Sequence, residues 1–238
     1  MKQLTKKILI ALLFAGSTAY ADVPVSHTNV KADTSLNTML QSYEKVILSG
    51  DTIKALDFTY PKVFTTTPKK QLIQMLKQQE SSGAPKPKIT AIKQTPVLPV
   101  KKYSKGSFTL VNYEMDMQMN FAQPGKEEMM EKMLKDPKEL ASFQNMMKNM
   151  FAATLGKDAT IEFEKGSFLA NVHQKSNYIA INEENKGYKI VELSAPTAAM
   201  LDKMLPKEIF DTYKTQIDAL KIEAENKMKA LMSAMGGQ

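Results

Sequence analysis

A strict alternation of hydrophobic and polar side chains marks a long β-strand near the centre of the chain. Over residues 107–122, SFTLVNYEMDMQMNFA, apolar residues occupy every second position from 111 to 121. Polar residues occupy the positions between them. Because successive side chains point to opposite faces of a strand, this pattern predicts one buried face and one face in water. The predicted buried face consists of Val111, Tyr113, Met115, Met117, Met119 and Phe121.

Residues 35–80 carry helical spacing and predict three short helices in series. Apolar residues recur every three to four positions over 36–47, which predicts one buried stripe on the first helix. The Ser-Gly-Asp run at 49–51 favours the end of that helix and the cap of the next. A Tyr-Pro step at 60–61 favours a turn, and Pro68 suits the first position of the third helix.

Beyond the long strand the period becomes helical and then returns to strands. We expect a helical insertion over 126–156, with Asp136 as the cap of its second helix. A turn at 175–176 is expected to separate two of the later strands. One further strand is predicted before the long strand, at 89–94. After the insertion, strands are predicted at 159–164, 167–175, 177–182 and 187–193, followed by a short helix at 197–205 and one long helix at 206–235.

The order of these elements resembles the nuclear-transport-factor-2-like group over roughly residues 33–123 and 157–213. The resemblance implies an α+β fold in which a curved, mainly antiparallel sheet wraps around the N-terminal helices as a cone. Some relatives are isomerases or cyclases that place an acid and a tyrosine in the pocket of the cone. Asp57 and Tyr60 are expected near such a pocket mouth, but no tight motif fixes them, so no catalytic residue is predicted. A local turn or helix bond is the simpler role for Asp57.

The ends of the chain divide it into segments. A basic start, an apolar run too short to span a bilayer, and Ala-Tyr-Ala at 19–21 predict a signal peptide over 1–21. We therefore expect a periplasmic or secreted protein with no membrane span after cleavage. A flexible arm is expected over 22–34, the cone domain over 35–213, and a C-terminal helix extension over 214–238, through which a homodimer could form.

Composition narrows the classes of function. The sequence has no Cys, so neither a disulfide framework nor a lipid-anchored start is expected. The formal net charge is +7, three of the lysines lie in the predicted leader, and every basic residue is Lys. Because Arg is the usual bidentate clamp for phosphate, its absence argues against nucleic acid or nucleotide partners. No Gly-rich phosphate loop, H-E-x-x-H, EF-hand or G-x-S-x-G pattern is found, so no cofactor is predicted.

Methionine is the unusual component, since nine of the 17 lie between Met115 and Met150. Thioethers fill irregular cores, line adaptable apolar pockets, or bind Cu(I). We expect the insertion to fold over the end of the apolar stripe, either closing a cavity or forming a packed subdomain. The predicted ligand-binding residues are Tyr113, Met115, Met117, Met119, Phe121, Phe143, Met147 and Met150.

The function that this sequence favours is an exported, non-catalytic protein with a Met-lined pocket for a small hydrophobic ligand or a protein partner. The alternatives are an isomerase- or cyclase-like enzyme on the same fold and a periplasmic Cu(I)-handling protein. An enzyme would need an ionisable residue buried in the pocket with a shifted pKa. Copper handling would need three converging thioether sulfurs. Plain binding would need a dry apolar cavity with neither feature.

Overall fold

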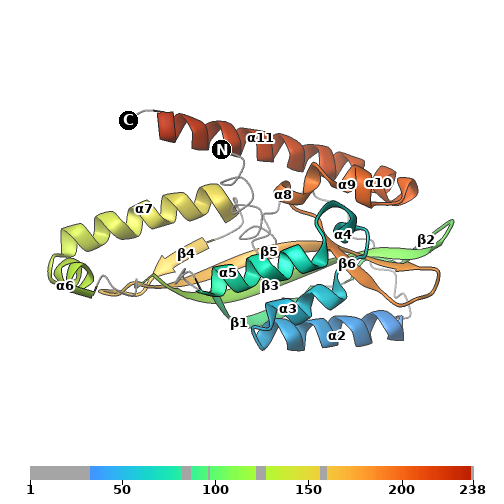
Figure 1. Ribbon diagram of the computed structural model, residues 1–238, viewed down its shortest axis with the longest axis horizontal. Helices are drawn as coiled ribbons and strands as arrows, with labels where there is room; N and C mark the ends of the chain where they lie inside the picture. The colour runs from blue at the N-terminus through green and yellow to red at the C-terminus, as the bar shows by residue number, and fades with distance from the viewer. Residues whose placement is uncertain (1–32, 82–86, 96, 122–126, 156–159, 237–238) are drawn as a thin grey trace.

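The computed structural model describes residues 33–81, 87–95, 97–121, 127–155 and 160–236, so the predicted signal peptide and most of the predicted arm lie outside it. The described chain is an α+β structure with a six-stranded sheet and helices on both of its faces (Figure 1), which confirms the predicted class. None of the described helices is long and apolar enough to cross a membrane. The helices are α2 Thr34–Leu48, α3 Thr52–Ala55, η1 Leu56–Phe58, α4 Val63–Thr66, α5 Lys69–Ser81, α6 Glu127–Lys135, α7 Pro137–Leu155, α8 Ala195–Ala198, α9 Leu201–Met204, α10 Lys207–Thr212 and α11 Lys214–Gly236.

Two long strands form the centre of the sheet. β3 and β5 pair antiparallel over their full lengths, from Gly106 opposite Glu183 to Asn120 opposite Leu169. β1 and β2 pair with the outer side of β3, and β4 and β6 pair with the outer side of β5, all antiparallel. The strands are β1 Pro87–Gln94, β2 Lys101–Tyr103, β3 Gly106–Asn120, β4 Thr160–Phe163, β5 Leu169–Glu183 and β6 Lys189–Glu192.

The alternation predicted for β3 is confirmed. All six apolar positions from Val111 to Phe121 are buried, whereas Asp116 and Asn120 are exposed. The prediction of one wet face fails only at the start of the strand, where Phe108 and Leu110 on the second face are also buried. They pack against apolar side chains of α8 to α11, which cover that end of the sheet.

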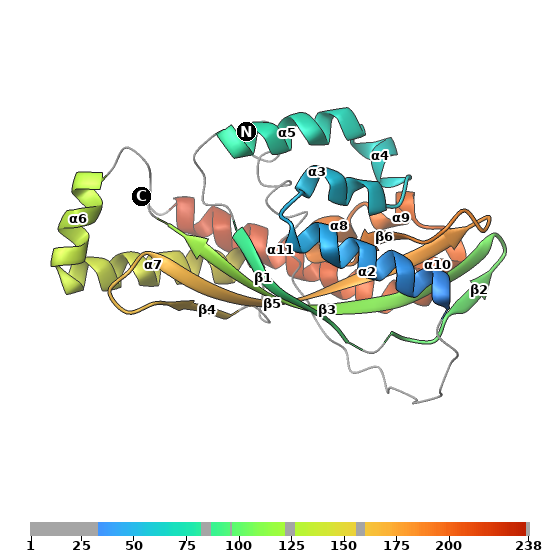
Figure 2. The ribbon, with the colours of Figure 1, turned by 90° about the horizontal axis from the view of Figure 1, so that it is seen from below.

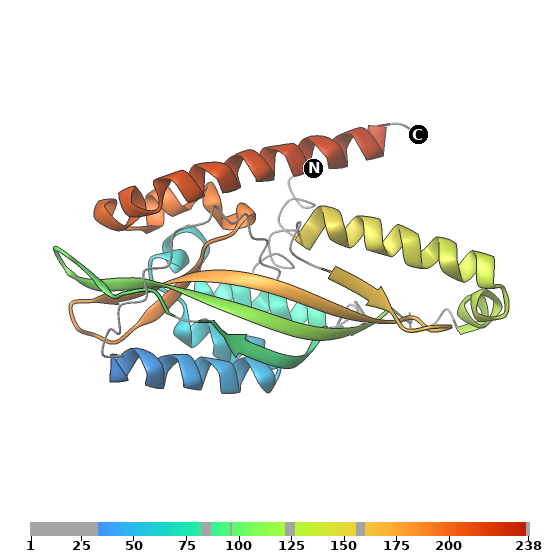
Figure 3. The ribbon, with the colours of Figure 1, turned by 180° about the vertical axis from the view of Figure 1, so that it is seen from behind.

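Different helices cover the same row of β3 side chains at its two ends. Val111, Tyr113 and Met115 pack with α2, whereas Met117 and Met119 pack with α6 and α7. Figures 1 and 3 show α2 below the sheet, with α7 and α11 above it. A strand that twists along its length turns one row of side chains from one side of the molecule toward the other, which explains this division.

Local signals in the first half of the chain are confirmed. Gly50 has φ +73° and follows α2, and the carboxylate of Asp51 accepts the backbone N–H of Lys54 at 2.8 Å. The start of α2 is capped by Asp33, which accepts the N–H groups of Ser35 and Leu36. Figure 2 shows α2, α3, α4 and α5 following one another on the same side of the sheet.

The helical insertion between β3 and β5 is also confirmed. Asp136 caps α7 by accepting the N–H groups of Lys138 and Glu139 at 2.9 and 3.3 Å. One hydrophobic cluster joins α6 and α7 to the end of the β3 stripe and to β4 and β5. Its buried members are Met117, Met119, Phe121, Met130, Leu140, Phe168, Ala170 and Val172.

Three predicted boundaries are wrong, one of them being the single helix expected at 197–205, which is divided into α8 and α9. The expected turn at 175–176 does not exist, because β5 continues through it with Lys175 opposite Glu114 and Ser176 opposite Tyr113. Pairing with β3 overrides the weak local signal of a Lys-Ser pair. The expected single C-terminal helix is divided into α10 and α11 at Tyr213, whose ring packs against Phe108 at 6.0 Å between centroids.

Candidate functional site

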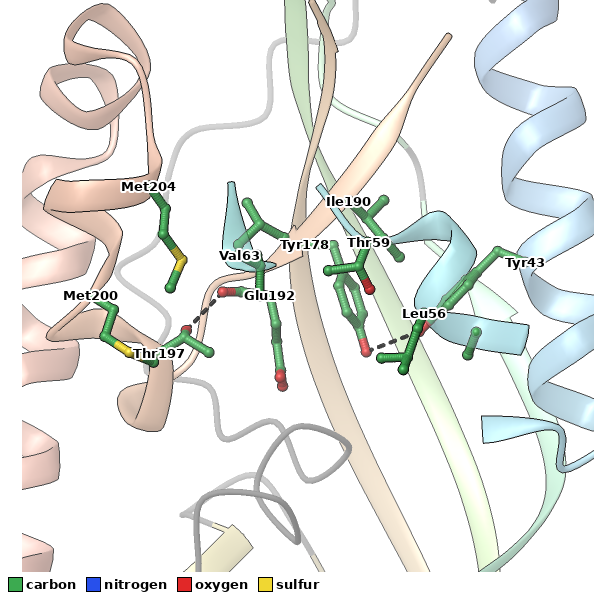
Figure 4. Close-up of a pocket in the computed structure, with 12 residues that line it drawn as sticks. Tyr43, Leu56, Thr59, Val63, Tyr178, Ile190, Glu192, Thr197, Met200 and Met204 are labelled. Atoms are coloured by element: carbon green, nitrogen blue, oxygen red, sulfur yellow. Dashed lines mark hydrogen bonds between the residues drawn. The ribbon is translucent and has the colours of Figure 1, made fainter. Parts of the chain in front are cut away.

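A cavity of about 70 Å³ lies beside strand β6, between two groups of short helices (Figure 4). Helices α3, η1 and α4 form one wall, and α8 and α9 form the opposite wall. The volume is several times the roughly 10–15 Å³ that one water molecule needs, and most of the lining surface is apolar. The described lining residues are Tyr43, Ala55, Leu56, Thr59, Val63, Tyr178, Ile190, Val191, Glu192, Thr197, Met200 and Met204.

Backbone pairing fixes the polar side chains of this cavity. Glu192 lies directly opposite Tyr178 in the register of β6 and β5, so both side chains project from the same face of the sheet. The hydroxyl of Thr197 donates to the backbone carbonyl of Glu192 at 2.7 Å and accepts the N–H of Ser194 at 3.2 Å. These bonds hold the turn from β6 into α8, and therefore also the position of Glu192.

The wall formed by α3, η1 and α4 is attached to the same strand. The N–H of Tyr60 donates to the carbonyl of Ile190 at 2.8 Å, and the Lys189 ammonium donates to the carbonyl of Asp57 at 2.6 Å. These bonds tie η1 and the residues that follow it to β6. The cavity is thus bounded by parts of the chain that are far apart in sequence and meet at one strand.

The carboxyl group of Glu192 is the unusual group in the cavity. Its side chain is buried, with the residue only 6% exposed, and neither carboxyl oxygen has a hydrogen-bond partner among the described residues. Burial disfavours the charged form and raises the pKa of Glu192 well above its usual value. An unpartnered acid in an apolar cavity is the type of group that functional sites retain.

Two tyrosine hydroxyls accompany this carboxyl group. The hydroxyl of Tyr43 donates to the hydroxyl of Tyr178, with an oxygen–oxygen distance of 3.4 Å. Figure 4 shows the Tyr178 hydroxyl and the Glu192 carboxyl pointing toward the same end of the cavity. Burial raises the pKa of both tyrosines, and the nearby Glu192 adds to the effect. Both phenols therefore stay protonated near neutral pH. Because the Tyr43 hydroxyl donates to Tyr178, the Tyr178 hydroxyl is the one that can donate to a ligand.

The predicted ligand-binding residues divide between two hydrophobic clusters. Tyr113 and Met115 lie in the cluster beneath α2, and the Tyr113 ring packs against Tyr43 and Tyr178 with centroids 6.0 and 5.9 Å away. The prediction thus includes a direct neighbour of the cavity. The other predicted residues whose side chains are described lie in the cluster at α6 and α7, namely Met117, Met119, Phe121, Phe143 and Met147. The side chain of Met150 lies outside the description.

The two residues expected near a pocket mouth have other partners. The Asp57 carboxylate is exposed and pairs with the Lys69 ammonium at 2.6 Å, so it makes a local surface contact. The hydroxyl of Tyr60 donates to the Glu183 carboxylate at 2.8 Å, and its ring belongs to the core beneath α8 to α11. Neither residue is part of the cavity lining.

Sequence reasoning missed Glu192 itself. The residue stands in a short strand between Val191 and Leu193, where an acid reads as the polar position of an alternating pattern. Its burial depends on α8 and α9, which fold back across β6. The residues next to Glu192 in the sequence do not indicate this contact. An acid placed between two core residues was the only available indication.

Methionines of β3 and of the insertion meet in one cluster. Met117, Met119 and Met130 are buried there, and Met133 and Met147 pack against them. Aromatic rings lie among them, including Phe143 and Phe168 at 5.3 Å between centroids. Among the described residues, no group of three or more His, Asp or Glu side chains is placed to hold a metal ion.

Comparison with known proteins gives no relative for this chain: no family model, no curated protein and no solved structure matches it.

Proposed function

We propose that the protein binds a small, largely apolar ligand in the cavity beside β6, with Glu192 as its polar anchor. The observation that carries the proposal is the buried Glu192 carboxyl, which lacks a hydrogen-bond partner among the described residues. Leaving such a group unsatisfied costs about 1–3 kcal/mol. A ligand that supplies the missing bond recovers this energy on binding, and the apolar walls supply the remaining contact.

This proposal moves the binding site away from the methionine cluster of the insertion. Met117 and Met119 are buried in a cluster of apolar side chains, which is the arrangement expected of a packed subdomain. Two other methionines, Met200 and Met204, line the cavity beside β6. Their flexible thioethers suit a wall that adapts to its ligand. The proposed pocket therefore remains partly Met-lined, but with different methionines from those predicted.

We propose a nuclear-transport-factor-2-like cone and a periplasmic or secreted location as the setting of this site. The cone is supported by the long antiparallel pair of β3 and β5, with α2 packed on one face. Export is supported by the basic start, the short apolar run and the Ala-Tyr-Ala sequence at 19–21. N-terminal sequencing of the exported protein tests the location, and a chain that retains Met1 contradicts it.

Binding is tested with three compounds that share a five-membered ring: cyclopentanol, cyclopentanone and cyclopentylamine. Saturation-transfer NMR should detect at least one of them on the wild-type protein. Met200→Trp should abolish the signal, because an indole beside the half-buried Met200 fills the cavity. The control Met146→Trp, on the exposed side of α7, should leave it unchanged. No binding to the wild-type protein, or binding that survives Met200→Trp, removes this cavity as the site.

Proton-transfer catalysis is the second candidate, and one specific observation favours it. The sequence criterion for an enzyme was a buried ionisable residue with a shifted pKa, and Glu192 meets it. A carboxyl with a raised pKa beside the Tyr178 phenol donor can exchange a proton with a carbon next to a carbonyl group. The test is deuterium exchange at the α-carbons of cyclopentanone in D2O. Catalysed exchange should vanish in Glu192→Gln and persist in Glu131→Gln, and an uncatalysed rate with the wild-type protein contradicts this candidate.

A further inference from the structure

The described residues that line the cavity include an acid but no basic side chain. Glu192 has the only carboxyl side chain among the described lining residues, and no Lys or His is among them. The other polar side chains are hydroxyls, those of Tyr43, Thr59, Tyr178 and Thr197. A ligand that enters therefore meets hydrogen-bond acceptors, neutral donors and two aromatic rings, and it meets no positive charge among these residues.

We propose that the ligand is a small organic cation, a compact amine whose ammonium group lies against the Glu192 carboxylate and the rings of Tyr43 and Tyr178. This inference rests on the proposed function, since it names the chemical class of the ligand for the same cavity. The apolar body of the amine would then lie between Leu56 and Val63 on one side and Met200 and Met204 on the other.

The Glu192 carboxyl favours a cation over a neutral or anionic ligand. A protonated carboxyl bound to a neutral ligand forms an ordinary hydrogen bond and leaves part of its accepting capacity unused. An ammonium group donates up to three hydrogen bonds, and charge-assisted bonds are roughly twice as strong as neutral ones. An anionic ligand would require Glu192 to stay protonated, and it would find no cation among the described lining residues to balance its charge.

The tyrosines add a second attraction for a cation. The rings of Tyr43 and Tyr178 lie 5.9 Å apart between centroids and are inclined at 67°. The faces of aromatic rings carry partial negative charge and attract ammonium groups. The rings of Tyr113 and Phe58 pack against the Tyr43 ring, with centroids 6.0 and 5.7 Å away, and fix its orientation. An alcohol of the same shape carries no positive charge and therefore does not gain this attraction.

Binding of an ammonium ion should remove the proton of the Glu192 carboxyl, and this release of a proton can be measured. In the free protein burial raises the pKa of Glu192 and so favours its neutral form, and an alkylamine in neutral solution carries one extra proton. When the ammonium ion binds, the Glu192 carboxyl loses its proton to the buffer, and the ion pair of ammonium and carboxylate remains. Binding of the amine therefore releases up to one proton, whereas binding of an alcohol releases none.

The test compares three compounds of nearly equal shape: cyclopentylamine, cyclopentanol and cyclopentanecarboxylate. Each is titrated into the full-length protein at pH 7 by calorimetry, in two buffers that differ in ionisation enthalpy. The amine should bind at least about tenfold more tightly than the alcohol, a ratio equal to 1.4 kcal/mol, and its binding should release protons, up to one per molecule bound. The carboxylate should bind more weakly than the alcohol.

Variants identify the group responsible. In Glu192→Gln the amine and the alcohol should bind with similar affinity, and no proton should be released. Glu131→Gln, an exposed acid on α6, should keep the wild-type preference. The comparison of the three compounds on the wild-type protein stands alone if Glu192→Gln does not fold. A cavity that prefers the alcohol or the carboxylate, or an amine preference that survives Glu192→Gln, overturns the inference and leaves the proposed function in place. Binding of none of the three overturns the inference, and if cyclopentanone does not bind either, the proposed function is overturned as well.

Discussion

The hydroxyl of Tyr188 donates a hydrogen bond of 2.8 Å to the carboxylate of Asp33, joining the turn before β6 to the first residues of α2. The other oxygen of that carboxylate accepts the N–H groups at the start of α2. One side chain thus caps a helix and fixes the helix to the sheet. Tyr188 is buried, and its hydroxyl also contacts the Ser107 hydroxyl at 3.0 Å. The link therefore extends to the start of strand β3.

Removing this link should lower stability in a pH-dependent way. Loss of a helix cap costs about 1 kcal/mol, so Asp33→Ala should unfold at a lower urea concentration than the wild type at pH 7. Hydrogen bonds, first of all from Ser35, hold the pKa of Asp33 below its usual value of 3.8. A lowered pKa contributes stability above pH 3.8 that is lost as the pH falls through the folded-state value. The difference between the two proteins should therefore shrink toward pH 2. A difference that is constant from pH 7 to pH 2 contradicts this, and Asp202→Ala on the exposed side of α9 is the control.

The buried acid of the cavity should have the opposite pH dependence. Because burial raises the pKa of Glu192, the folded protein holds this proton more tightly than the unfolded chain does. The stabilising contribution is complete below pH 4.5 and falls as the pH rises toward the folded-state pKa, by up to about 1.4 kcal/mol per pH unit for one proton. Urea unfolding from pH 4 to pH 8 should show this decline in the wild type relative to Glu192→Gln. Parallel stability curves for the two proteins would show that Glu192 does not titrate in this range.

The two faces of β3 should respond differently to exchange of polar and apolar side chains. Met117 is buried among apolar neighbours, so Met117→Asp should destabilise the protein by about 3 kcal/mol or more. Asp116 lies on the open face, where its carboxylate contacts His173 at 2.7 Å with both side chains substantially exposed. Asp116→Met should therefore change the free energy of unfolding by less than about 1 kcal/mol. Thermal unfolding of the two variants decides the matter, and equal melting temperatures would be inconsistent with the face assignment.

The C-terminal half of α11 should be dispensable for folding. Ile217 and Leu220 are buried in the core, whereas Ile222 and Met228 further along are 60% and 49% exposed. A chain that ends at Lys221 should unfold cooperatively, with a melting temperature close to that of the full-length protein. A chain that ends at Lys214 should not fold, because it lacks both buried residues. If the exposed face forms the proposed homodimer, light scattering should show that the shorter folded chain is monomeric while the full chain is dimeric. A chain ending at Lys221 that fails to fold would show that the distal half belongs to the core.

Sequence patterns predicted the elements whose signals are local. The alternation from Val111 to Phe121 specifies a half-buried strand, and Gly50 and Asp51 specify a helix boundary, because neighbouring residues suffice to determine each. The continuity of β5 through Lys175 and Ser176 could not be predicted, since it depends on pairing with β3. The grouping of the predicted site residues could not be predicted either, because the twist of the sheet sends one row of side chains to different helices.

The candidate site was even less accessible to prediction from sequence. Its walls come from residues 43–63 and 178–204, and only the folded sheet brings them together. Glu192 is unusual because of its environment, which α8 and α9 create from outside its own strand. The criterion for recognising an active-site acid could be stated in advance, but the residue that meets it could not be selected without the fold.

The pairing of β3 with β5 has a consequence for the rate at which the chain folds. Even the nearest partners, Asn120 and Leu169, are separated in sequence by the whole of α6, α7 and β4. The centre of the sheet therefore forms only after a long loop closes, and loop closure costs conformational entropy. Proteins dominated by such distant contacts fold slowly, in milliseconds to seconds. Until that closure, the apolar row of β3 is without its partner strand, and this interval is when the chain is most prone to aggregate.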